Sequence, residues 1–286
     1  ADVLVIAVPH QFLDELYPQL RGRLAAGAQI LSLVKGMHLD GDKLIPLSLR
    51  IASETGYVTS MLAGPNLYTE MAKGGFAEAT IGHTAANRDG AHLLQLLCTT
   101  EAFRVDLVED LIGVDLCAAL KNVVAIACGL GSREMGNTRC CIIRRGFLEI
   151  SHICLEFFPS VNPATFTTAA GIGDLMLTCS VGRGQRLAAA FAAAEGAASW
   201  EELQQSELGG MKIPDLHNLR TVCSFLRANA ALDHFPLIAA THCIAFEGGS
   251  TSELSAALRT APPTLRRLAM TNTYNIESVD AINETM

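Results

Sequence analysis

The 286-residue sequence has few charged residues and no excess of basic ones: 17% are Asp, Glu, Lys or Arg, and the formal net charge is −8. A nucleic-acid-binding protein needs a basic face, so this composition argues against that class. An anionic small molecule would have to be held by a local group of lysines and arginines. Half of the residues are apolar, which predicts well-buried layers, and the length allows two domains.

The sequence also lacks the patterns of metal sites, membrane spans, secretion signals and internal repeats. Its nine cysteines show no metal-ligand spacing and stand mostly among apolar residues, which predicts buried thiols in a reducing compartment. No uncharged apolar stretch reaches the roughly 18 residues of a membrane span. No basic segment precedes an apolar leader. We therefore expect a soluble, cytoplasmic protein with no metal and no membrane partner.

The first part of the chain alternates short apolar runs with helical patterns. The apolar periodicity predicts helices over 12–26 and 44–54, and strands over 3–8, 29–34, 58–62 and 79–82. This alternation is typical of a parallel sheet with helices on both faces, where ligands bind at the carboxyl ends of the strands. Three loops follow such ends: Pro9 to Phe12, Lys35-Gly36 and Gly64 to Asn66.

No G-x-G-x-x-G turn follows any of these strands, although this turn holds the pyrophosphate of a dinucleotide at a helix N-terminus. Ala1 and Asp2 lead directly into the first apolar run. We therefore expect residues 1–108 to be a partial Rossmann-like domain without its first strands and glycine-rich loop. We also expect the chain as it stands to bind NAD poorly.

From about Glu109 the patterns are helical, over 114–129, 140–158, 187–194, 213–228 and 236–246. The predicted fold is thus α/β plus all-α: the C-terminal part of a Rossmann-like parallel sheet, followed by an all-helical substrate domain over residues 109–260. The segment 261–286 is polar, contains Pro262-Pro263 and shows no period, so we expect a loosely ordered tail.

Lys121 stands inside an almost uninterrupted apolar run from Leu116 to Cys128. A helix that is apolar nearly all round is buried, and a buried ammonium group needs a carboxylate or an anion, or else it loses its proton. Either outcome suits proton transfer. The alternative, a lysine that extends its amine to the surface from a helix edge, is equally supported by this window alone.

A second group of polar residues lies in the glycine-rich segment 171–186. Asp174 and Thr178 are four residues apart and share one face of a helix, although Asp174 could also be an ordinary first-turn carboxylate. Arg183 and Arg186 suit a phosphate, because the arginine fork matches phosphate oxygens. A solvated surface loop explains the two arginines equally well.

Five ordered blocks of the sequence resemble the eukaryotic type of NAD-dependent glycerol-3-phosphate dehydrogenase, over roughly 1–258. They are Val-Pro-His-Gln-Phe (8–12), Ser-Leu-Val-Lys-Gly (32–36), Ala-Leu-Lys-Asn-Val-Val-Ala (119–125), Gly-Asp-Leu-Met-Leu-Thr-Cys (173–179) and Phe-Pro-Leu (235–237). The order and spacing of these blocks are more specific than any one of them. The resemblance implies an enzyme that interconverts dihydroxyacetone phosphate and sn-glycerol 3-phosphate with NAD, and that forms a homodimer.

The resemblance also implies roles for single residues. Lys121 resembles the general acid/base, and Lys35 the second lysine, in contact with substrate and cofactor. Asp174 and Thr178 resemble residues that orient this lysine and the substrate. The remaining implied contacts are Asn122 and Arg183 with the substrate, and Phe12 and Arg183 with the cofactor.

The sequence departs from the family pattern at several of these contacts. Gly184 stands where the family has a phosphate-binding asparagine, and loss of one buried hydrogen bond predicts substrate binding weaker by roughly 1–3 kcal/mol. Tyr68 replaces a small residue that touches the cofactor. Of the cofactor-binding segment only Lys212 is kept, and Pro214 cannot donate a backbone hydrogen bond.

These departures leave two further hypotheses open. One is a non-catalytic relative that keeps the fold for phosphate binding or oligomerisation. The other is a related dehydrogenase for a different hydroxy acid.

Overall fold

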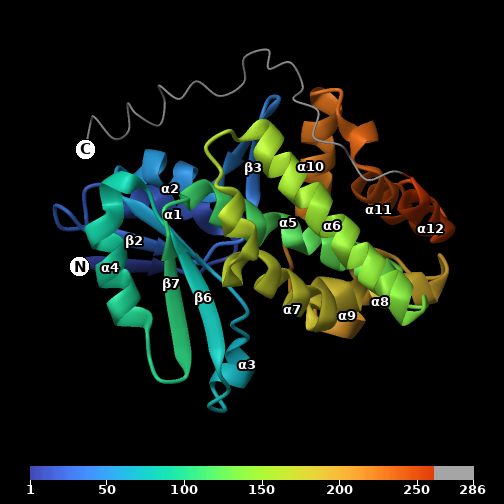
Figure 1. Ribbon diagram of the computed structural model, residues 1–286, viewed down its shortest axis with the longest axis horizontal. Helices are drawn as coiled ribbons and strands as arrows, with labels where there is room; N and C mark the ends of the chain where they lie inside the picture. Colours follow the sequence, from blue (N-terminus) through green and yellow to red (C-terminus); the bar gives the residue numbers. More distant parts are fainter. Residues whose placement is uncertain (261–286) are drawn as a thin grey trace.

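The computed structural model describes residues 1–260 as a five-stranded sheet followed by a body of helices (Figure 1). The strands of this sheet are β1 (Val3–Ile6), β2 (Gln29–Ser32), β5 (Thr59–Ala63), β6 (Ala77–Gly82) and β7 (Phe103–Val108), in the spatial order β1-β2-β5-β6-β7. The four predicted strands are all present. The strand β7 was not predicted, because its pattern of half-buried and exposed residues gives no continuous apolar run.

The sheet is mixed: the predicted parallel arrangement is confirmed for β1, β2 and β5 and is wrong for β6, the last of the predicted strands. The strands β1, β2 and β5 are parallel, β6 runs antiparallel to β5, and β7 is parallel to β6. A parallel crossover needs a helix that packs back across the sheet. The connection between β5 and β6 holds only the one-turn α3 (Tyr68–Met71), which projects away from the sheet (Figure 1).

Helices cover both faces of the sheet. The helices α1 (Leu13–Leu20) and α2 (Leu47–Thr55) bury Leu13 and Ile51 against Ile30 of β2 on one face. On the other face α4 (Arg88–Cys98) buries Leu94 against Leu31. Since successive strand residues point to opposite faces, neighbouring Ile30 and Leu31 belong to two separate cores.

Two predicted helix boundaries are wrong. The helix predicted over 12–26 ends at Leu20, because Gly22 takes a positive φ of 67° that continues no helix. The helix predicted from residue 44 begins at Leu47, after the hairpin of β3 (Met37–Asp40) and β4 (Lys43–Pro46). This hairpin turns at Gly41-Asp42, where Gly41 has a φ of 61°, so its Gly-Asp turn signal was present in the sequence.

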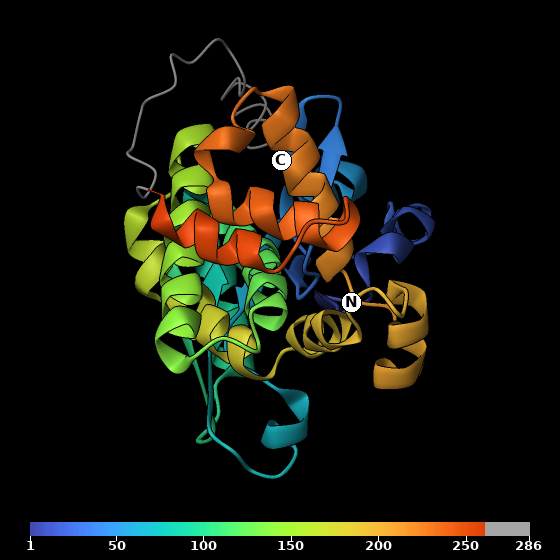
Figure 2. The same cartoon turned by 90° about the vertical axis from the view of Figure 1, so that its right-hand side faces the viewer.

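The helical part follows β7 and is drawn toward the viewer in Figure 2. Its main helices are α5 (Leu111–Leu130), α6 (Gly136–Phe157), α7 (Asp174–Val181), α8 (Arg183–Ala194), α9 (Trp200–Leu208), α10 (Asp215–Ala228), α11 (Pro236–Phe246) and α12 (Ser252–Arg259). The short helical turns η3 (Pro163–Thr167), η4 (Ala169–Gly173) and η5 (Leu232–His234) lie between these helices, whereas η1 (His10–Phe12) and η2 (Ala85–Asn87) lie in the sheet part. The main helices lie within residues 109–260, where the sequence predicted a helical domain; the domain itself stays a prediction.

The helix α5 connects the two parts. Its first turns share a core with the sheet, through Val114 and Ala118 packed against Met61 and Ala63. Its later residues belong to the large core of the helical part. The division at residues 108 and 109 stays a prediction, although β7 ends at Val108 and α5 begins at Leu111.

By length and composition α5 could cross a membrane, with a mean hydropathy of 1.9 over 18 residues, but 94% of that window is buried inside the fold. It also carries Asp115 and Lys121. Its apolar surface therefore faces other helices and the sheet. Asp110 caps its first turn by accepting a hydrogen bond from the Gly113 amide.

All nine cysteines are free thiols. Five are buried as predicted, namely Cys117, Cys128, Cys154, Cys179 and Cys223, whereas Cys98 and Cys243 are only half-buried. The adjacent Cys140 and Cys141 are exposed rather than buried, because they lie on the outer side of the first turns of α6. The predicted tail, 261–286, lies outside the described residues.

Candidate functional site

The side chain of Lys121 is buried in the middle of α5, with 3% of its surface exposed. The alternative of a lysine that extends its amine to the surface is therefore wrong. Nearly every other residue of this helix is also buried, so the ammonium group depends on a protein carboxylate for its charge balance.

Asp174 supplies that carboxylate from the first turn of α7. Its Oδ2 forms an ion pair with the Lys121 Nζ and lies 3.6 Å from the Lys35 Nζ. Asp174 is itself 2% exposed. Lys35 follows the carboxyl end of β2, and its side chain keeps 31% of its surface exposed. Two lysines from separate elements thus share one buried carboxylate, beside the edge of the sheet where the sequence predicted a ligand.

Thr178 lies one turn after Asp174 on α7. Its hydroxyl donates a hydrogen bond of 2.6 Å to the Asp174 backbone carbonyl, and the carboxylate Oδ1 lies 3.5 Å away. The threonine therefore lies against the carboxylate that holds Lys121. Asn122, the neighbour of Lys121 on α5, is 6% exposed.

Burial lowers the pKa of Lys121 from 10.5 to about 8. Loss of hydration is the largest cause, because it disfavours the charged amine. The Asp174 carboxylate acts in the opposite direction, and the nearby Lys35 ammonium lowers the pKa further. A lysine with this pKa can both hold and release a proton near neutral pH.

Arg183 and Gly184 begin α8, on the other side of the lysines. Arg183 is exposed at the surface, and its guanidinium contacts the sulfur of Met211. Gly184 is buried beneath it. A β-carbon at residue 184 would overlap the carboxylate of Asp215. The space for a side chain at this position is therefore occupied by another residue.

Asp215, the first residue of α10, was not predicted as a site residue. It is 5% exposed, and burial raises the pKa of its carboxyl to about 6, against the opposing effects of Arg183, Lys121 and Lys35. In the sequence, an aspartate after Pro214 indicates only the first turn of a helix. Its approach to Gly184 depends on how α8 and α10 pack, which no local pattern encodes.

Two histidines next to the lysine loop were also missed. His10 of η1 and His217 of α10 stack with ring centroids 4.9 Å apart, and the His10 ring lies against Gly36. Burial, the largest cause in both cases, lowers the pKa of each ring. The Pro-His-Gln-Phe block places His10 here, but its partner comes from 207 residues later in the chain.

The other predicted cofactor contacts are exposed or half-buried. Phe12 ends η1 with 47% of its surface exposed, and Tyr68 begins α3 with 78% exposed. Lys212 and Pro214 lie in the loop that leads into α10, where Lys212 is exposed and Pro214 half-buried. In the part of the chain that the structure describes, no hydrogen bond or ion pair links these four residues to Lys35, Lys121 or Asp174.

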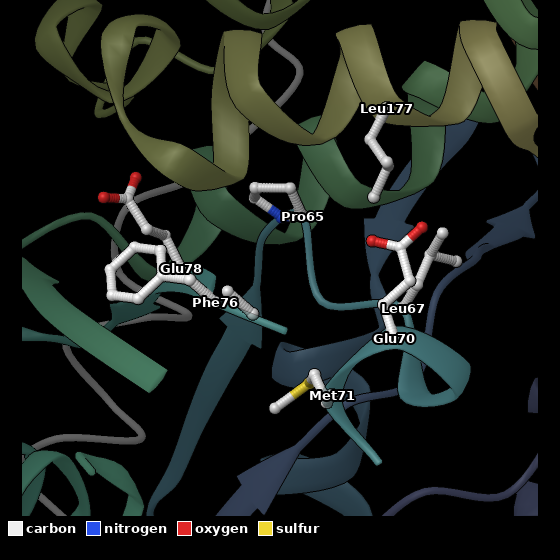
Figure 3. Close-up of a pocket in the computed structure, with 8 residues that line it drawn as sticks. Pro65, Leu67, Glu70, Met71, Phe76, Glu78 and Leu177 are labelled. Atoms are coloured by element: carbon white, nitrogen blue, oxygen red, sulfur yellow. The ribbon is translucent and has the colours of Figure 1, made fainter. Parts of the chain in front are cut away.

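A cavity of about 360 Å³ lies beside the cluster, between α7 and the segment that joins β5 to β6 (Figure 3). Leu177 of α7 points toward the loop that carries Leu67 and Glu70. The lining side chains are apolar or acidic, namely Pro65, Leu67, Glu70, Met71, Phe76, Ala77, Glu78 and Leu177. This cavity therefore offers no cation for a phosphate. The group of Lys35, Lys121 and Arg183 is the better candidate for binding an anionic substrate.

Among residues 1–260 no group of three or more His, Cys, Asp or Glu side chains could hold a metal ion. The charged groups that converge on the site are two lysines, an arginine and two buried aspartates. Such a set can hold an anion and move a proton without a metal.

Two family models match the chain. The model described as the NAD-dependent glycerol-3-phosphate dehydrogenase N-terminus matches residues 1–89, and the corresponding C-terminus model matches residues 110–256. Together these ranges include Lys35, Lys121, Asp174, Arg183 and Asp215.

Curated relatives show the same likeness. The chain is 38% identical to the glycerol-3-phosphate dehydrogenase [NAD(+)] of Cuphea lanceolata. It is 37% identical to the chloroplastic glycerol-3-phosphate dehydrogenase [NAD(+)] 1 of Arabidopsis thaliana, and each match covers 85% of this chain. It spans 65% and 61% of those two proteins, less than two thirds of their length. It is 35% identical to the cytoplasmic enzyme of Rattus norvegicus over 92% of this chain and 75% of that one.

A solved structure agrees with these relatives. The glycerol-3-phosphate dehydrogenase of Plasmodium falciparum superposes with a TM-score of 0.85 at 28% identity, over 91% of this chain and 73% of that one. The mixed sheet and the helical body are thus shared with that protein.

Proposed function

Because the chain belongs to the NAD-dependent glycerol-3-phosphate dehydrogenase family, we propose that it interconverts dihydroxyacetone phosphate and sn-glycerol 3-phosphate by hydride transfer with NAD. One observation carries the proposal: the buried Lys121 amine, paired with Asp174 and next to Lys35, at the carboxyl edge of the sheet. This arrangement provides proton transfer and positive charge in one place.

Lys121 is the proposed general acid/base. In the reducing direction its ammonium group gives a proton to the ketone oxygen while a hydride reaches the ketone carbon, which leaves a neutral amine and an alcohol. In the oxidising direction the neutral amine takes the proton of the hydroxyl group. A pKa of about 8 suits both directions, because proton transfer is most efficient when the pKa is near the working pH.

Asp174 keeps the two amines in place, and Thr178 lies against its carboxylate. Lys35, partly exposed, is positioned to contact the substrate and draw electron density from the ketone. Arg183 is the proposed partner of the substrate phosphate, since a guanidinium matches two phosphate oxygens at once. Asn122 is proposed to bind a substrate hydroxyl or carbonyl oxygen.

The residues present fit the nicotinamide end of NAD. Phe12 exposes an apolar ring after β1, where a flat heterocycle could pack, and Lys35 follows the next strand. When bound, NAD supplies or accepts the hydride. Phe12, Lys35, Tyr68, Arg183, Lys212 and Pro214 are the proposed contacts, and the protein's own share of the chemistry is to orient both reactants and move the proton.

The test is NADH-dependent reduction of dihydroxyacetone phosphate by the full chain and by Lys121→Ala. We expect kcat/KM to fall by about 10²- to 10⁴-fold, the usual contribution of a general acid. Lys73→Ala, at an exposed lysine, is the matched control and should retain the rate. Equal rates for Lys121→Ala and the wild type would refute the assigned role. Absence of turnover by a wild-type chain that binds NADH in calorimetry would favour a non-catalytic relative.

We further propose a homodimer in the cytoplasm, without nucleic-acid or membrane partners. The free thiols, the net charge of −8 and the burial of α5 support this location and this lack of partners. Light scattering coupled to size-exclusion chromatography tests the dimer, because the measured mass should be twice the 30.4 kDa mass of the chain. A monomer over the whole concentration range would contradict it.

A further inference from the structure

Asp215 places a second carboxylate among the cations of the site. Arg183 of α8, Lys121 of α5 and Lys35 of the loop after β2 all act on it electrostatically. Asp174 of α7 already pairs with the two lysines. A carboxylate that faces cations meant for a phosphate competes with that phosphate when it is ionised.

The position of Asp215 is defined by Gly184. The three atoms nearest to a β-carbon at residue 184 are the Oδ1, Cγ and Cβ of Asp215. The carboxyl group therefore fills the volume that a side chain on residue 184 would use, directly after Arg183. An asparagine could enter position 184 only if Asp215 moved, so the two residues form one unit of the site.

The protonation state of Asp215 decides whether this part of the site repels or binds a dianion. As a carboxylate it repels a dianion and has no proton to donate. As a neutral acid it can donate a hydrogen bond to a phosphate oxygen. Burial raises the pKa to about 6, while the three cations lower it. A bound dianion would offset those cations, and the pKa would rise further, so the neutral form would be favoured near pH 7.

We propose that Asp215 is a specificity-determining residue of the anion subsite, and that a dianion binds next to Arg183 together with one proton on the Asp215 carboxyl. That the natural dianion is a substrate phosphate rests on the proposed function. The proton linkage itself can be measured with a simple anion and needs no turnover.

A merely structural role for Asp215 has a different signature. A first-turn carboxylate stabilises a helix through its dipole, so removing it would change the stability of α10 and leave the pH dependence of anion binding unaltered. Proton uptake on anion binding therefore separates the two roles.

The experiment is calorimetric titration of the full chain with sulfate, which stays a dianion over the pH range used. Wild-type sulfate affinity should fall at least about fivefold between pH 5.5 and 7.5, because linkage allows up to tenfold per pH unit per proton. Titrations in two buffers of different ionisation enthalpy should show uptake of a proton at pH 7. Asp215→Asn should bind sulfate at least about fivefold more tightly than the wild type at pH 7.5, with little pH dependence.

Asp233→Asn is the matched control, since it removes one negative charge from an exposed position in η5. It should leave the wild-type pH dependence unchanged. Equal or weaker sulfate binding by Asp215→Asn overturns the proposal, and so does an absence of sulfate binding to both proteins. If Asp215→Asn fails to fold, the proton count of the wild type decides alone, and a count of zero overturns the proposal.

Turnover of dihydroxyacetone phosphate is measured separately on the same preparations. Proton-linked sulfate binding without turnover would refute the proposed function and leave the role of Asp215 standing. Turnover together with pH-independent sulfate binding would support the proposed function and refute the role of Asp215.

Discussion

The ammonium group of Lys121 is removed from water and has a carboxylate, Asp174, in direct contact. Desolvation and the second amine of Lys35 favour the neutral form, and Asp174 favours the charged form. Desolvation and Lys35 outweigh Asp174, so the pKa of this lysine falls from 10.5 to about 8. The same balance explains why a lysine, rather than the more strongly basic arginine, suits this position.

A pH dependence of catalysis follows from the Lys121 pKa of about 8. Reduction needs the protonated amine, so kcat/KM for dihydroxyacetone phosphate should fall as the pH rises through about 8. Oxidation needs the neutral amine, so kcat/KM for glycerol 3-phosphate should rise over the same range. Steady-state rates measured in both directions on the full chain test this, and profiles that change in the same sense would contradict it.

Asp215→Asn serves as the control for this assignment. This substitution should change the pH profile of kcat/KM near the Asp215 pKa of about 6. The inflection due to Lys121 should remain. Loss of both inflections in that variant would mean that the two groups titrate as one unit.

The helices α5 and α8 approach each other closely at Gly129. A β-carbon there would overlap the Gln185 carbonyl and the Ala188 side chain. This close approach brings the start of α8, with Arg183 and Gly184, next to the lysine on α5. The absence of a side chain at Gly129 thus contributes to the position of Arg183, the residue proposed to bind the substrate phosphate.

We therefore expect Gly129→Ala to push α8 outward. Overpacking of a buried contact should lower the free energy of unfolding by about 1–3 kcal/mol, as measured by urea denaturation. The displaced Arg183 should lower kcat/KM for dihydroxyacetone phosphate by about tenfold or more, because sub-ångström errors in position are costly to catalysis. The inflection near pH 8 should remain, since Lys121 and Asp174 keep their contact.

Gly136→Ala is the matched control for this change. Gly136 begins α6 with open space around its Cα, and the exchange should be neutral or stabilising by a few tenths of a kcal/mol. Equal effects of the two substitutions on kcat/KM would show that α8 is not positioned by the contact at Gly129.

At the scale of the whole molecule, α5 belongs to both cores. It packs against β5 and β6 at its start and against α6, α7, α8 and α10 along its length. The site is assembled across this shared helix, with Lys35 from the sheet side and Asp174, Arg183 and Asp215 from the helical side. Separating the two parts would expose α5 and take the site apart.

This shared core predicts that the chain unfolds in one transition despite its two kinds of architecture. The single tryptophan, Trp200, lies on α9 and stacks against Phe191 of α8, so its fluorescence reports on the helical part. Its urea transition should coincide with that of far-UV circular dichroism, which reports on all helices. Two separated midpoints would show that the parts unfold independently.

The sequence by itself determined the class of fold and most of the helices, and it singled out Lys121, Lys35 and Asp174, which the structure brings together. Hydrophobic periodicity is a local property, and it placed α5 and α11 well because both are strongly apolar. It could not give the direction of β6 relative to β5, because strand direction depends on how distant segments pack. The hairpin of β3 and β4 was missed although its Gly41-Asp42 turn is a local signal in the sequence.

The tertiary structure decided the rest of the site. A sequence pattern can show that Lys121 is surrounded by apolar neighbours, but only packing shows that Asp174 meets it and that Lys35 joins them. The same holds for Asp215, whose position among the cations depends on the absence of a side chain at Gly184 on another helix. Electrostatic effects between residues act through space, and the fold alone sets those distances.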